Sequence, residues 1–254
     1  MQAPTWDLRD RFARCQFDRW SATVDLRKPD RGLTDFQIGG HRLSGTELLG
    51  LSWPAPQVDL RSELVECYHR GPDLIAAYCE SAAWPVRVDA RWRVAPSTEV
   101  AAVLAIVDLI VSVRTELLES WPELAVRSSI PSREVLGLTG AESAHFAPFP
   151  DIAAVPVVVN SERGPGCWLF RFLDTELSYG EMVHPADFQR SDLKRPAGLA
   201  AAVEVRHRLF AERLERGVIL RARVRGVLVD AVDDARQVAG CYAAFAAADP
   251  PLGA

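Results

Sequence analysis

The clearest alternation of hydrophobic and polar positions lies in two adjoining stretches of the first half of the chain. From Val86 to Val94 every even position is apolar and every odd position is charged, which predicts a strand with one buried face and one face in solvent. After Pro96, half of the residues from Val100 to Val113 are valine or isoleucine, and the odd positions from 103 onward are all apolar. This pattern favours a long, mostly buried strand over a helix. The two stretches predict a sheet protein, with Asp108 either paired or at a cleft.

The same period of two recurs along most of the chain and predicts a meander of antiparallel strands. Strands are expected at Phe17–Arg27, Glu47–Trp53, Val155–Asn160, Trp168–Leu173, Glu176–His184, Val203–Leu209 and Val218–Val229, with a hairpin over Leu64–Glu80. Turn residues separate several of them, at Pro29–Gly32, Gly39–Gly40 and Arg70–Asp73. The pattern loosens between Leu118 and Pro150, and Asp187–Pro196, which is rich in charge and proline, is expected to be a linker.

The period changes near the C-terminus. The stretch from Asp230 to Ala248 is rich in alanine, has Asp233 and Asp234 where its first turn would be, and is followed by Asp249 and two prolines, so it predicts a helix. We therefore expect one all-β domain over residues 1–254, a large antiparallel sandwich of stacked sheets with a C-terminal α-helix.

Composition narrows the class of partner. A chain of 254 residues with a formal net charge of -5 does not look like a general nucleic-acid binder. The first ten residues lack the basic flank and apolar centre of a secretion signal, and the apolar run from Val100 is too short to span a bilayer. We expect a soluble, cytoplasmic protein that does not bind membranes.

The cysteines indicate neither a metal site nor a disulfide framework. The five are scattered and form no CxxC pair. If His69 lies opposite Leu74 in the expected hairpin, Cys67 and Cys79 fall on opposite faces, so we expect free thiols. No cofactor is indicated.

A family resemblance rests on the order and rhythm of the strands. The hairpin Tyr68–Tyr78 runs through Trp84 and Pro85 into the strand that ends at Val94, within a long meander of about this length. This arrangement resembles the β-supersandwich of the galactose mutarotase-like proteins, a superfamily of aldose epimerases and of non-catalytic sugar-binding domains. The resemblance implies a supersandwich fold and a small-molecule or glycan ligand.

The epimerases of that superfamily present a catalytic histidine after an asparagine and a glutamate base in a Glu-x-Gln context. Here no histidine follows an asparagine. Ring-opening epimerisation still needs a proton donor for the ring oxygen and a base for the anomeric hydroxyl. The candidates for such an acid–base pair are His145, His184 and Glu204, brought together from distant strands; otherwise these residues are structural. Glu181 and His184 would point to opposite faces of a regular strand.

The arginines suggest a ligand. Eight of them share polar strand faces with only two acids, Asp89 and Glu204, and they fall in three groups: Arg87, Arg91 and Arg93; Arg206 and Arg208; Arg221, Arg223 and Arg225. Facing arginines repel one another unless acids or ligand anions lie between them. Either acids from other strands fill the gaps, or a concave face binds an anionic or phosphorylated sugar. The candidate ligand-binding residues are Arg91, Arg93, Arg206, Arg208, Arg221 and Arg223.

Two functions remain open. Trp168, Phe170 and Phe172 could stack on a sugar, but aromatic residues at a period of two are more often core residues, and we predict core. The chain is either a carbohydrate-binding domain without catalysis or an aldose 1-epimerase-like isomerase acting on a hexose or hexose phosphate. A histidine and a carboxylate facing one another in a single cleft would distinguish the second from the first.

Overall fold

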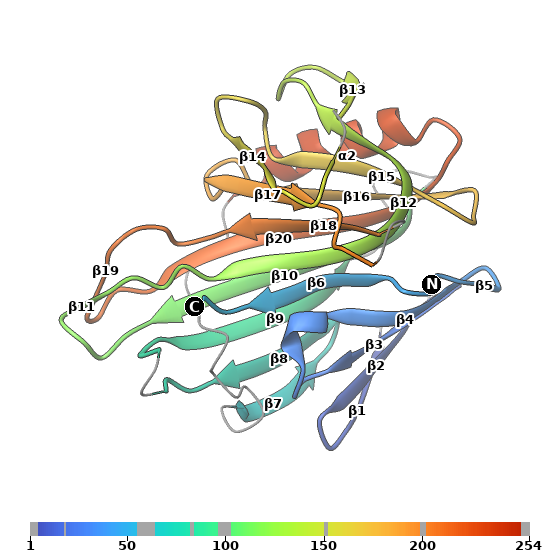
Figure 1. Cartoon of the computed structure of the whole chain (residues 1–254). Coiled ribbons are helices and arrows are strands. Elements are labelled where there is room, and N and C mark those ends of the chain that lie inside the picture. The colour runs from blue at the N-terminus through green and yellow to red at the C-terminus, as the bar shows by residue number, and fades with distance from the viewer. Residues whose placement is uncertain are drawn as a thin grey trace.

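The structure, a computed structural model, describes residues 5–17, 19–54, 64–81, 84–95, 103–149, 152–198 and 202–249. Antiparallel strands form two layers that pack face to face, with one long helix at the C-terminal end of the described chain (Figure 1). The protein is therefore all-β with a C-terminal helix, as the alternation predicts.

The strands divide between the layers as follows. Layer 1 contains β1 (Thr5–Arg9), β2 (Phe12–Phe17), β3 (Trp20–Asp25), β4 (Leu33–Ile38), β5 (His41–Arg42), β6 (Glu47–Ser52), β14 (Val157–Asn160), β17 (Arg190–Lys194) and β18 (Ala202–Arg208). Layer 2 contains β7 (Leu64–Arg70), β8 (Asp73–Tyr78), β9 (Arg87–Ala95), β10 (Val103–Arg114), β13 (Phe146–Pro148), β15 (Cys167–Phe172), β16 (Leu177–Val183) and β20 (Leu220–Asp230). A separate small ribbon pairs β11 (Glu119–Ser120) with β19 (Leu214–Glu215).

One strand belongs to both layers. The first half of β12 (Ala125–Leu138) pairs with β6 and β18 in layer 1, and its second half, from Ser132, pairs with β15 and β13 in layer 2. The sequence did not predict this strand, which lies where the alternation loosens. The linker expected at Asp187–Pro196 is also wrong, because β17 lies within it and pairs with both β14 and β18.

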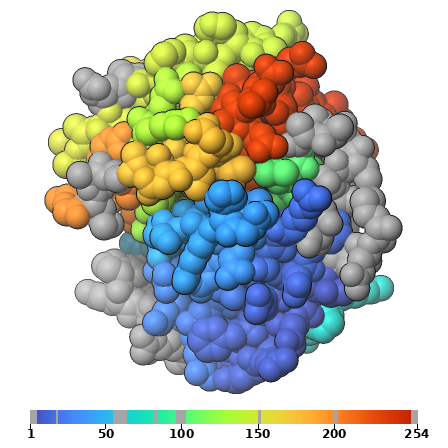
Figure 2. Space-filling view, turned by 90° about the vertical axis from the view of Figure 1, so that its right-hand side faces the viewer, coloured from blue at the N-terminus to red at the C-terminus, as the bar shows by residue number. Residues whose placement is uncertain are grey.

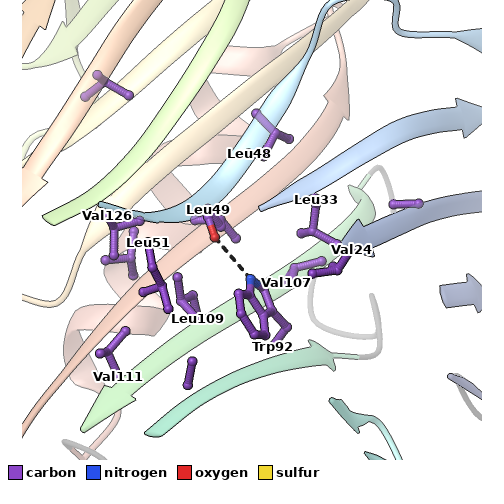
Figure 3. Packing of buried hydrophobic residues seen from close by; sticks show 14 of the residues in the cluster. Val24, Leu33, Leu48, Leu49, Leu51, Trp92, Val107, Leu109, Val111 and Val126 are labelled. Carbon is purple, nitrogen blue, oxygen red and sulfur yellow. Dashed lines mark hydrogen bonds between the residues drawn. The ribbon is translucent and has the colours of Figure 1, made fainter. Parts of the chain in front are cut away.

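The core lies between the two layers. Trp92 on β9 is fully buried, and its indole N–H donates to the carbonyl of Leu49 on β6 at 3.0 Å (Figure 3). The odd positions of β10, including Val107, Leu109 and Val111, point into this core, as predicted. Asp108, on the opposite face of β10, is paired with Arg225. Other aromatic residues of the core include Trp168, Phe170 and Phe172, which confirms the prediction that these three are core residues.

The helix α2 (Asp234–Ala247) covers part of the outer face of layer 2. Its residues Val238, Tyr242 and Phe245 pack against the outward side chains of β12, β15, β16 and β20 in a second apolar cluster. Asp234 fixes its first turn, since it accepts two hydrogen bonds from the Arg171 guanidinium, both at 2.9 Å. In the space-filling view the helix (red) lies on the upper part of the face, above the N-terminal strands (blue) (Figure 2).

The hairpin β7–β8 has the predicted register, with His69 opposite Leu74. None of the five cysteines is in a disulfide, as predicted. Within the described residues, no helix combines the length and the hydrophobicity of a membrane-spanning segment.

A close approach of two backbones positions the edge of layer 1. The short 3₁₀ turn η1 (Pro29–Arg31) lies directly on β6, and a Cβ atom at Gly50 would come within 2.2 Å of the Asp30 carbonyl oxygen. Gly32 has a φ of 59°, which favours glycine, and its Cβ would meet the Leu48 carbonyl at 2.1 Å. The two glycines therefore let Arg31 reach the side chain of Glu47 on the outer face.

Candidate functional site

A network of ion pairs crosses the outer face of layer 1. On β18, Val203, Val205 and His207 point into the core, so Glu204, Arg206 and Arg208 point outward. This alternation is the one that the sequence predicts, and it brings two of the candidate ligand-binding arginines together with the candidate base.

Glu204 is nearly buried at the centre of the network. Its Oε2 accepts a hydrogen bond from Arg127 Nε at 2.8 Å, and its Oε1 lies 2.9 Å from Arg206 Nε and 3.1 Å from Lys194 Nζ. Burial by itself would raise the pKa of Glu204, but the hydrogen bonds and charges of these three cations outweigh it and lower the pKa. The carboxylate is thus ionised, and both of its oxygens are engaged.

The network continues to both sides of Glu204. Arg127 also donates to Glu47 at 2.9 Å, and Glu47 accepts a further hydrogen bond from Arg31 at 2.7 Å. Farther along the face, Asp192 is held between two arginines, Arg190 and Arg208, each at 2.7 Å. The charged side chains across these strands are therefore fixed in position before any ligand arrives.

A hollow adjoins the network on the outer face of β1–β4. Its volume is about 570 Å³, and it is lined by Asp7, Arg9, Phe12, Ala13, Arg14, Thr23, Asp25, Lys28, Arg31, Thr34 and Asp35. A smaller hollow of about 330 Å³ shares Arg14, Thr23 and Asp35 with it. The first has the size of a small-ligand site, and Arg31 belongs both to its wall and to the ion-pair network.

The charges in the main hollow are mixed in sign. Asp7 pairs with Arg9, and Asp35 accepts from Thr23 at 3.1 Å. In the part of the chain that the structure describes, neither Arg14 nor Lys28 has an ion-pair partner. Phe12 exposes 54% of its surface at the edge of the hollow.

The structure does not bring the three candidate catalytic residues together. His145 lies in the exposed loop before β13. His184 follows β16 at the far side of layer 2, where its Nε2 lies 3.1 Å from the Ala248 carbonyl and its ring contacts Phe245 edge-on. Opposite Glu204, the neighbouring position on β12 is Ser129 rather than a histidine.

A histidine and a carboxylate do meet, but in the core. His207 Nε2 lies 2.9 Å from Glu181 Oε1, and neither side chain is exposed. The hydroxyls of Ser128 and Tyr179 donate to the other oxygen of Glu181, and Ser191 Oγ lies 2.8 Å from His207 Nδ1. With no exposed surface, this pair offers no place for a substrate and instead joins the two layers.

Sequence reasoning missed this pair, although a signal was present. His207 follows Val203 and Val205 on the apolar side of β18, and Glu181 lies between Tyr179 and Val183 on the inward side of β16. A polar residue in an apolar row is expected to have a buried partner. The predicted opposition of Glu181 and His184 is confirmed, since the first points into the core and the second toward α2.

The other candidate arginines lie on the outer face of layer 2, on the opposite side of the sandwich. Arg93 donates to Asp73 at 2.7 and 2.9 Å, and Arg225 donates to Asp108 at 2.7 and 3.0 Å. Acids from neighbouring strands therefore pair with two of the arginines on this face. Arg91 lies 3.8 Å from Asp73, Arg221 donates to the Ser112 hydroxyl at 2.9 Å, and Arg223 packs against the ring of Phe245.

No group of three or more potential metal ligands occurs among the described residues.

No family model matches the sequence. No curated protein is similar to it either. Solved structures do match the fold. A protein assigned as a mutarotase from Salmonella typhimurium superposes with a TM-score of 0.58 at 11% identity, covering 90% of this chain and 94% of that one. A protein assigned as an aldose 1-epimerase from Escherichia coli K12 gives a TM-score of 0.58 at 9% identity, with 89% and 99% covered.

A larger enzyme contains a similar unit. The α-galactosidase AgaB from Geobacillus stearothermophilus gives a TM-score of 0.53 at 8% identity, and the match covers 90% of this chain but 41% of that enzyme. At these identities the likeness concerns the fold and not the chemistry. The chain has the β-supersandwich fold of the galactose mutarotase-like proteins.

Proposed function

We propose that this protein is a carbohydrate-binding domain that holds a sugar in the hollow on the outer face of layer 1, without catalysis. The observation that carries the proposal is the hollow of about 570 Å³ beside a network of fixed ionic side chains. A sugar presents neighbouring hydroxyls, each of which both donates and accepts a hydrogen bond. A wall on which carboxylates alternate with guanidinium groups matches that pattern.

The fixed side chains reduce the entropy that is lost on binding. Arg31 is already held by Glu47, and Thr23 by Thr34 and Asp35, so these groups lose little freedom when a ligand arrives. The exposed ring of Phe12 offers an apolar surface for the C–H face of a sugar ring.

The charges favour an anionic sugar. Arg14 and Lys28 line the hollow without a counter-ion in the described structure. Farther along the same face, Arg206 shares Glu204 with Arg127 and Lys194, and Arg208 shares Asp192 with Arg190, so cations outnumber acids there. A carboxylate or phosphate on the sugar would supply the missing negative charge, and hydrogen bonds to charged groups are the stronger kind.

Calorimetric titration tests this assignment with galactose, glucuronate and glucose 6-phosphate. The double variant Arg14→Ala, Lys28→Ala should lose on the order of 1.5–3 kcal/mol of binding free energy for the acidic sugars. As a control, Arg213→Ala removes an arginine that is also exposed but lies by the β11–β19 ribbon, and it should bind as the wild type does. Equal affinity of the double variant and the wild type, or no binding of any sugar, would contradict the proposal.

The alternative is an aldose 1-epimerase-like isomerase acting on a hexose or hexose phosphate. The fold shared with proteins assigned as epimerases favours it, and Glu204 would be the base. The lowered pKa of Glu204 and the serine opposite it argue for binding alone. Polarimetry of freshly dissolved α-D-glucose and α-D-galactose decides the matter. A rate above the spontaneous one that disappears in Glu204→Gln would replace our proposal with the isomerase.

A further inference from the structure

Three hollows on the outer face of layer 1 adjoin one another around Asp35 on β4. Asp35 lines the main hollow, the second hollow of about 330 Å³, and a third hollow of about 120 Å³ beside the segment that follows β5. The main and second hollows also share Arg14 and Thr23. The second and third hollows share Arg42. A ligand in the main hollow therefore lies directly beside the second one.

A β-bulge places Asp35 at this junction. Along the pair β3–β4, Ser21 lies opposite Gln37, but the next pair of residues is Thr23 and Thr34, so β4 has an extra residue. The extra residue is Asp35, whose φ is 51°. As a result, Thr34 and Asp35 are adjacent in the chain and yet both line the main hollow. Residues with a side chain seldom adopt such a φ, and those that do are often found at functional sites.

The Asp35 carboxylate holds two neighbouring side chains. Its Oδ2 accepts a hydrogen bond from the Thr23 hydroxyl at 3.1 Å, and its Oδ1 accepts one from Arg42 Nη2 at 3.0 Å. Arg42 lies on β5, the second strand of the β4–β5 hairpin. The Arg42 guanidinium is therefore held at the wall of the second hollow before a ligand arrives, which reduces the entropy lost on binding.

All of the described residues that line the second hollow are polar or charged. Ser21 and Gln37 supply a hydroxyl and an amide, Arg14 and Arg42 supply guanidinium groups, and Asp35 is the only acid among these described residues. The main and second hollows both have the size of small-ligand sites, whereas the third is smaller. Each of the two larger hollows can therefore hold a sugar unit.

Basic side chains outnumber acids around the two larger hollows. The basic residues of their walls are Arg9, Arg14, Lys28, Arg31 and Arg42. The acidic residues are Asp7, Asp25 and Asp35. Five basic groups against three acids leave a positive excess of two, although the whole chain has a net charge of -5. A ligand with one carboxylate in each hollow would balance this excess.

We propose that the outer face of layer 1 binds an acidic oligosaccharide, of which one unit occupies the main hollow and the next unit occupies the second hollow. This inference rests on the proposed function and names the class of carbohydrate that the site takes. Arg14 lines both hollows and serves both units, and the Arg42 guanidinium binds the carboxylate of the second unit. A single sugar leaves the second hollow unused.

Isothermal titration calorimetry with single acidic sugars and their linked dimers tests the inference. The probes are glucuronate with diglucuronate, and galacturonate with digalacturonate, all at constant ionic strength. At least one dimer should bind the wild type roughly ten- to a hundredfold more tightly than its monomer does, because the second unit adds hydrogen bonds to charged groups.

Two variants remove exposed side chains that line the second hollow but not the main one. Arg42→Ala should weaken binding of the dimer roughly tenfold, and Gln37→Ala roughly threefold. Both variants should bind the monomer as the wild type does, which separates the loss of the second unit from damage to the main hollow.

Arg27→Ala is the matched control. Arg27 is exposed and pairs with Asp10 at 2.9 Å, much as Arg42 pairs with Asp35 at 3.0 Å, but it lines none of the three hollows. This variant should bind both the monomer and the dimer as the wild type does.

The outcomes distinguish this inference from the proposed function. Binding of a monomer without tighter binding of either dimer would overturn the oligosaccharide and leave the carbohydrate-binding domain standing. A dimer whose advantage survives both Arg42→Ala and Gln37→Ala would also overturn it, because the second unit would then lie elsewhere. If no monomer or dimer binds, the inference falls, and the proposed function falls with it when galactose and glucose 6-phosphate fail to bind as well.

Discussion

Replacing Val111 by aspartate is expected to abolish soluble expression of the protein. Val111 is fully buried, and on the inner face of layer 2 it lies between Ala90 of β9 and Ala222 of β20. None of these neighbours can pair with a carboxylate. An unpaired buried ion costs several kcal/mol even after relaxation, which is comparable with the 5–15 kcal/mol that stabilises a typical domain.

The preceding residue provides a matched control. Ile110 lies on the same strand but faces outward, between Arg91 and Arg223, so the same substitution there places a carboxylate next to two cations. Ile110→Asp is expected to give soluble protein that melts at or above the wild-type temperature. Comparable soluble yield and melting temperature from Val111→Asp would mean that the inner face of β10 is not a closed core.

Removal of the Glu181 side chain is expected to lower the free energy of unfolding by about 3–5 kcal/mol. Three groups from two layers direct hydrogen bonds to this one carboxylate: the hydroxyls of Ser128 and Tyr179, and Nε2 of His207. In Glu181→Ala all three lose their partner at positions that water does not reach, and each buried polar group left alone costs about 1–3 kcal/mol. Urea denaturation followed by tryptophan fluorescence measures the loss.

A double-mutant cycle separates this network from simple loss of packing. Residues that share a hydrogen bond are coupled, so Glu181→Ala and His207→Ala together should destabilise the protein by clearly less than the sum of the two single changes. Additive effects would show that the hydrogen bond between the layers contributes nothing beyond the volume of the two side chains.

The sequence predicted the strands that keep one face in the core from end to end. β9 alternates without interruption, and every odd-numbered residue of β10 is buried. In the β7–β8 hairpin the turn residues fix the register that places His69 opposite Leu74. β12 does not behave in this way. It leaves layer 1 near Pro131, enters layer 2 with a register irregularity after Ser132, and carries buried serines where an apolar row would be expected. When a strand passes from one sheet to the other, the alternation of inward and outward side chains along it is interrupted.

The sequence could predict which residues of the candidate site share a strand face, but not where those strands lie in the fold. Alternation alone showed that Arg206 and Arg208 share one face, and that Arg221 and Arg223 share another. It could not show that β18 and β20 belong to different layers, because that depends on pairings with strands far away in the sequence. The acids that neutralise Arg93 and Arg208 come from such pairings as well.

The pairing of β10 has a consequence for how the chain folds as it is synthesised. One edge of β10 joins β9, its neighbour in sequence, but the other edge joins β20, and the paired residues Asp108 and Arg225 are 117 positions apart. Contacts between distant segments form slowly, because a long loop must close first. Until β20 leaves the ribosome, an edge rich in valine and isoleucine has no partner, and such edges pair readily with other chains. The strand that completes this pairing is thus the last of the described strands to be made, and growing chains are most prone to aggregate before it emerges.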